Sequence, residues 1–149
     1  MSTQAIVGAA AGAVLLGGGG TLAAYAAGAF SNDTYFIKAK REFTEKSYIA
    51  EKEEEMKGWL TQQNKETTYK TDLKNNIKKM TGISKTAPTE DKVNKLQGET
   101  APTTAEAKEI YDYAKNWCES KKETVYKGEE SEAEFEIFKK VCFVNSPVA

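Results

Sequence analysis

The pattern of hydrophobic and polar positions divides the chain into two parts. From Met1 to Asn32 no residue is charged, and alanine, glycine and aliphatic side chains dominate the segment. The central stretch, Ala5 to Phe30, is 26 residues long, which exceeds the roughly 20 residues that a helix needs to cross a bilayer core. We therefore predict that residues 1–32 form a single transmembrane anchor in contact with membrane lipid.

A cleaved secretion signal is the alternative for this segment. Ala24 to Ala26 matches an A-x-A-like cleavage sequence, but the basic region that normally precedes a signal is absent, so we favour an uncleaved anchor. Gly8 and Gly12 match the G-x-x-x-G pattern that lets helices pack closely, and Gly20, Ala24 and Gly28 again place a small residue at every fourth position. Such packing would give a homodimer through the anchor, whereas a lone anchor is the simpler interpretation.

Residues 33–80 carry helical periodicity. Apolar residues recur at helical spacing from Tyr35 to Phe43, so we expect the anchor helix to continue beyond the membrane. From Ala50 to Asn64, glutamates oppose an apolar side that is formed by Met56, Trp59 and Leu60. Glu53 and Lys57 make an i,i+4 pair on this helix. A second helix is predicted from Thr68 to Met80, with Gly82 ending it.

Residues 81–103 are rich in threonine and lysine and contain two prolines, which favours a mobile linker with a short helical turn near residues 90–96. Residues 104–149 are predicted to form a helical hairpin. Each of its helices begins with the S/T-x-x-E pattern of a capping box, Thr103 with Glu106 and Ser131 with Glu134. The predicted fold class is thus mainly α.

The two cysteines, Cys118 and Cys142, lie near the C-terminal ends of the apolar stripes of these two helices. A bond between them would close a loop of 24 residues and stabilise the domain by about 3 kcal/mol. The alternative is a pair of reduced cysteines packed as small hydrophobic side chains. The bond requires the C-terminal ends of both helices to converge, which a short antiparallel hairpin does not ensure.

The amino-acid composition excludes several kinds of catalytic and metal-binding site. Histidine is absent, which removes the usual general base and the Ser-His-Asp and Cys-His forms of catalysis. Two cysteines without histidine do not make a common structural zinc site, so we predict no metal and no cofactor. The net charge of −1, with both signs intermixed, gives no basic footprint for nucleic acid.

Two features disagree about which side of the membrane holds the charged domain. Lys38, Lys40 and Arg41 follow the predicted anchor and no basic residue precedes it, so the positive-inside rule places the domain in the cytoplasm. A disulfide would instead place it in an oxidising, extracytoplasmic environment.

The chain resembles the paralogous, membrane-anchored protein families of haemotrophic mycoplasmas. The resemblance rests on the charge-free start, a Lys/Glu-rich domain with Trp59-Leu60, and Trp117-Cys118 followed by Cys142. It implies a single-pass protein whose C-terminal domain is displayed outside the cell and varies among paralogues as an antigen. It implies no catalytic residues.

Three functions follow from these observations. The first is a surface module that binds a host protein or is bound by antibody. The second is a cytoplasm-facing scaffold or adaptor that binds a partner through an exposed face of Met56, Trp59 and Leu60. The third, an enzyme that uses the glutamates of residues 51–55 or 129–136 as paired carboxylates, is disfavoured because no pocket-forming pattern surrounds them.

Overall fold

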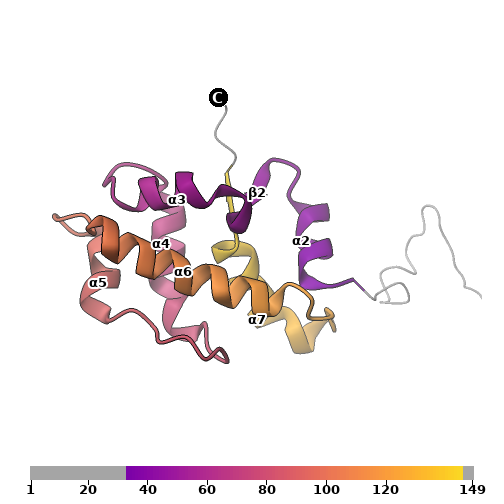
Figure 1. The fold of residues 1–149 in the computed structure, drawn as a ribbon. Coiled ribbons are helices and arrows are strands. Elements are labelled where there is room, and N and C mark those ends of the chain that lie inside the picture. The colour runs from indigo at the N-terminus through magenta and orange to yellow at the C-terminus, as the bar shows by residue number, and fades with distance from the viewer. Residues whose placement is uncertain (1–32, 146–149) are drawn as a thin grey trace, which may run out of the picture.

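The computed structural model describes residues 33–145, which form helices around one core and one small antiparallel sheet (Figure 1). The mainly α prediction is confirmed. In chain order the elements are α2 (Tyr35–Glu42), β2 (Lys46–Tyr48), η2 (Ile49–Lys52), α3 (Glu53–Leu60), α4 (Thr67–Asn76), η3 (Ile77–Lys79), α5 (Glu90–Asn94), η4 (Lys95–Gln97), α6 (Thr104–Lys121), α7 (Glu129–Val141) and β3 (Phe143–Asn145).

The predicted anchor, with Gly8, Gly12, Gly20 and Gly28, lies outside the described residues. Between residues 33 and 145, every helix is too short or too polar to cross a membrane.

Helix α2 begins on its own rather than as a continuation of the anchor, so that prediction is wrong. Thr34 is extended, with φ −80° and ψ 166°, and its hydroxyl accepts a hydrogen bond from the Ile37 N–H. This is an N-cap, which starts a helix by satisfying one of its free N–H groups. Thr34 also forms a β-bridge with Val125, which holds the start of the domain against the turn between α6 and α7.

Helix α6 is the longest element of residues 33–145 and runs across most of the domain in Figure 1. The predicted capping box is confirmed at its start. The Thr103 hydroxyl accepts from the Glu106 N–H at 3.2 Å, and the Glu106 carboxylate accepts from the Thr103 N–H at 2.9 Å. The buried side of α6 carries the apolar stripe read from the sequence, namely Ala107, Ile110, Ala114, Trp117 and Cys118. Tyr111 and Tyr113 are buried beside it and were not predicted.

Helix α7 begins earlier in the chain than predicted. Its N-cap is Gly128 rather than Ser131. Gly128 has φ +71°, a backbone conformation that residues other than glycine rarely adopt. Ser131 is therefore inside the first turn, where its hydroxyl accepts from the Lys127 N–H at 2.9 Å. The predicted Ser131–Glu134 capping box is wrong because the glycine turn determines where the helix starts.

Residues 81–103 belong to the domain core rather than to a linker. The predicted helical turn is present as α5 and η4, and it buries Val93 and Leu96, which are 4% and 2% exposed. Helix α5 packs on α6, and η4 packs on α4. Ion pairs of Lys92 with Glu109 and of Lys95 with Glu106 also join this segment to α6, although its composition is that of a loop.

Helices α6 and α7 do not form the predicted side-by-side hairpin. In such a hairpin Cys142 would lie about 20 Å from Cys118, because α7 has 13 residues and rises about 1.5 Å per residue. The observed distance between their Cα atoms is 5.7 Å. The two C-terminal ends converge, while α6 packs mainly on α3 and α7 mainly on α4.

The short sheet was not predicted. It pairs Tyr48 with Phe143 and Lys46 with Asn145, and so joins the N-terminal region of the described chain to its C-terminal end. Aromatic rings fill the space beneath it, with the Phe143 ring centroid 5.5 Å from that of Tyr48 and 5.9 Å from that of Phe138. Contacts between aromatic rings stabilise a fold by more than the burial of their apolar area alone.

Candidate functional site

The structure contains the predicted disulfide between Cys118 and Cys142, and both residues are 0% exposed. The bond joins the last turn of α6 to the C-cap of α7. The Cys142 carbonyl also accepts a hydrogen bond of 3.0 Å from the Ile49 N–H, which connects the bond to the β2 side of the domain. The disulfide therefore crosslinks α6 and α7, contacts η2 through this hydrogen bond, and is shielded from solvent in the folded state.

The predicted exposed binding face on α3 is wrong. Met56 and Leu60 are each 1% exposed and belong to the core, and Trp59 is partly buried against it. The apolar side of α3 is covered because α3 packs against α6. These residues therefore do not offer a docking surface to a partner helix in the folded domain.

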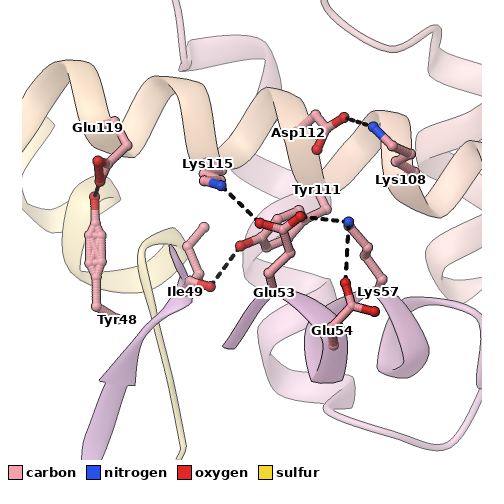
Figure 2. Close-up of polar contacts among 10 residues, drawn as sticks. All are labelled: Tyr48, Ile49, Glu53, Glu54, Lys57, Lys108, Tyr111, Asp112, Lys115 and Glu119. Carbon is pink, nitrogen blue, oxygen red and sulfur yellow. Dashed lines mark hydrogen bonds and ion pairs between the residues drawn. The ribbon is translucent and has the colours of Figure 1, made fainter. Parts of the chain in front are cut away.

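A network of charges lies at the solvent-accessible edge of the contact between α3 and α6 (Figure 2). Glu53 lies at its centre, with one carboxylate oxygen 2.6 Å from the Lys57 Nζ and the other 2.8 Å from the Lys115 Nζ. Hydrogen bonds from Lys115 and then from Lys57 lower the pKa of Glu53 from 4.5 to about 2. The pairing with Lys57 was predicted from spacing, whereas Lys115 is brought in by the packing of α3 on α6.

Tyrosine hydroxyls tie this region to the backbone and to α6. Tyr111 donates to the Ile49 carbonyl at 2.8 Å, and Tyr48 donates to Glu119 at 2.7 Å (Figure 2). Burial is the main cause that raises the pKa of both hydroxyls. Every tyrosine within residues 33–145 donates its hydroxyl to a partner in the chain, and the other four are Tyr35, Tyr69, Tyr113 and Tyr126.

The glutamate clusters considered for catalysis lie on helix surfaces, and five of their members form ion pairs, namely Glu53, Glu54, Glu55, Glu134 and Glu136. Among the described carboxyl groups, those with a clearly shifted pKa are all shifted downward, and they are Glu42, Glu53, Glu90, Glu106, Glu119 and Glu136. A carboxyl that serves as a general acid near neutral pH needs the opposite shift. In residues 33–145 no cluster of three or more potential metal ligands occurs.

A shallow groove of about 510 Å³ lies between the turn that follows α3 and the loop that precedes α6. The Gln63 side-chain amide joins these two segments by donating to the Gly98 carbonyl at 3.0 Å. Leu96 lies in the groove, and the other lining residues are Gln63, Asn64, Thr67, Gln97, Gly98 and Glu99. The lining has no lysine or arginine, so the groove offers no positive charge to an anionic ligand.

No family model, no curated protein and no solved structure matches this chain. Function is therefore inferred from the residues and their geometry. Of the residues singled out in the sequence, the structure brings together Cys118 and Cys142 and confirms the pair of Glu53 with Lys57, while Met56 and Leu60 lie in the core.

Proposed function

We propose that this protein is a membrane-anchored binding module whose domain, residues 33–145, is displayed on the outer face of the cell. The observation that carries the proposal is the buried bond between Cys118 and Cys142. Structural disulfides form and persist in oxidising compartments and are rare in cytosolic proteins. The positive-inside rule favours the opposite orientation, so topology is the property to test.

Binding rather than catalysis is supported by the state of the polar side chains. The described tyrosine hydroxyls are bound within the chain, and the shifted carboxyl groups have lowered pKa values. These groups fix the fold and leave a surface of lysines, glutamates and hydroxyls that is suited to contact with another molecule. The partner of such a module would be a host molecule or an antibody, reached from outside the cell.

The scaffold hypothesis loses the docking face on which it depended. It needed Met56, Trp59 and Leu60 to form one exposed apolar face, and two of the three are buried. Among residues 33–145, the basic cluster of Lys38, Lys40 and Arg41 still favours a cytoplasmic orientation, which the topology test addresses.

Protease shaving of intact cells tests the topology. Lys65 and Lys85 are exposed and lie outside the helices and strands, so trypsin should cut the domain in intact cells. Permeabilised cells provide the control for protease access, and a cytoplasmic protein that stays whole provides the control for cell integrity. A domain that is cut only after permeabilisation would overturn the proposal.

Thiol labelling gives an independent measurement. Without reductant, a membrane-permeant alkylating reagent added under denaturing conditions should label neither Cys118 nor Cys142, and both should react after reduction. Two free thiols in freshly prepared protein would remove the observation on which the outward orientation rests.

A further inference from the structure

The segment from Leu73 to Thr89 has a strong local positive charge that the net charge of the whole chain hides. It contains four lysines and no aspartate or glutamate, although the chain as a whole has a net charge of −1. Lys78 forms an ion pair with Glu90 just beyond the segment. For the other three, Lys74, Lys79 and Lys85, no ion-pair partner exists among residues 33–145. Lys79 and Lys85 are exposed, and Lys74 is half-buried.

The loop in this segment, residues 80–89 between η3 and α5, is held in place at both ends. Tyr113 donates its hydroxyl to the Met80 carbonyl, and the Trp117 indole N–H donates to the Thr81 carbonyl at 3.1 Å. At the other end Pro88 is buried, and the ion pair of Lys78 with Glu90 joins the two ends. Compact loops with adjoining ends are frequently functional. A fixed loop also loses less conformational entropy when it binds a ligand.

The same loop presents hydrogen-bond donors. Within the described part of the chain, the backbone N–H groups of residues 82–87 make no hydrogen bond to another residue. Neither do the hydroxyls of Thr81, Ser84 and Thr86, which are exposed. In Figure 1 this segment, between α4 and α5, runs along the lower edge of the domain. Lysine ammonium groups and free N–H and O–H donors together favour an anionic ligand.

We propose that this cationic loop, defined by Lys74, Lys79, Lys85 and the N–H groups of residues 82–87, binds an anionic polysaccharide that carries sulfate or carboxylate groups. The lysines are spread over twelve positions on α4, η3 and the loop, and they do not enclose a buried site for one small ion. A polymer with regularly repeated negative charges matches that spread. The polysaccharide's location outside the cell rests on the proposed outward display of the domain.

Other polyanions fit less well. Docking on a lipid surface is strengthened by apolar side chains that insert beside the lysines, and Ile83, the large apolar residue of the loop, packs partly against the core instead. Binding of single-stranded nucleic acid normally uses exposed aromatic rings for stacking, and the rings nearest the loop, Tyr113 and Trp117, are buried. Sulfated or uronic polysaccharides need only the charges and donors that the loop displays.

The test measures the fluorescence anisotropy of a labelled heparin octasaccharide with the full-length, oxidised protein in non-ionic detergent. The wild type should bind at low ionic strength and weaken as salt is added. The variant K74Q/K79Q/K85Q should bind at least about tenfold more weakly, since each lost exposed ion pair contributes a few-fold. The control K40Q/K65Q/K127Q removes three exposed lysines elsewhere, and it should change binding by less than about twofold because distant exposed charges are screened.

Circular dichroism and the retained disulfide show whether each variant is folded. Equal weakening by both triple variants, no binding by the wild type, or tighter binding to anionic vesicles or to a single-stranded oligonucleotide would overturn the loop proposal. Its failure is separable from that of the proposed function. Heparin binding by a chain that resists shaving would overturn only the outward display, whereas a shaved chain that does not bind heparin would overturn only the loop proposal.

Discussion

Replacing both cysteines by alanine, C118A/C142A, removes the covalent link between the end of α6 and the end of α7. The bond closes a loop with a sequence separation of 24 residues, for which the chain-entropy model gives a stabilisation of about 3.4 kcal/mol. Loss of two fully buried sulfur atoms adds on the order of 1 kcal/mol through poorer packing. A domain of this size has a total stability of about 6 to 17 kcal/mol, so the expected loss is a large part of it.

Urea unfolding, followed by tryptophan fluorescence, measures this change. We expect a lower transition midpoint and a steeper dependence on urea, because the unfolded chain is more expanded without the cross-link. The entropic part alone corresponds to a fall in Tm of about 14 °C for a domain of this length. Wild-type protein reduced in the unfolded state and refolded under reductant is the control that keeps both sulfur atoms. A loss below about 1 kcal/mol in both samples would show that the bond is not a structural brace.

Three further pairs of variants, each a test with its control, probe the polar contacts by chemical unfolding. The pKa of Glu53 is about 2 in the folded protein and 4.5 ordinarily, so the ionised carboxylate stabilises the fold above pH 4.5, and this stabilisation is lost as the pH falls toward 2. E53Q should therefore reduce the acid-induced loss of stability, and the control E54Q should not. Y111F removes the buried hydrogen bond to the Ile49 carbonyl and should cost about 1 kcal/mol, whereas Y126F, whose hydroxyl bond is exposed, should cost less than about 0.5 kcal/mol. Equal costs would contradict this ranking. T103A should cost about 1 kcal/mol, and T103S, which keeps the capping oxygen, should recover most of it.

Local patterns were reliable where a single helix carried all the necessary information. The capping box of Thr103 and Glu106 and the apolar stripe of α6 depend on residues within a few turns of one another, and both are present as predicted. The pair of Glu53 with Lys57 is of the same kind. The start of α7 was misplaced because Gly128, with its positive φ, determines the turn more strongly than the Ser131 pattern does.

Misassignments at longer range have a common physical cause. The apolar side of α3 was expected to be exposed, yet α6 covers it, and nothing in α3 itself says which helix will do so. Residues 81–103 look like a linker by composition, yet Val93 and Leu96 are buried and Lys92 and Lys95 form ion pairs with α6. The strands β2 and β3 have three residues each, too few to show an alternating pattern.

The sequence by itself determined the helical class, the positions of the principal helices and the two residues able to form a disulfide, because periodicity, capping and cysteine count are local properties. Only the tertiary structure decided that the C-terminal ends of α6 and α7 converge, which brings the Cα atoms of Cys118 and Cys142 to 5.7 Å. It also decided that Met56 and Leu60 face inward and that Tyr113 and Trp117 hold the loop that contains Lys85. These outcomes depend on which surfaces pack together, and that choice is made by the burial of the whole core rather than by any one segment.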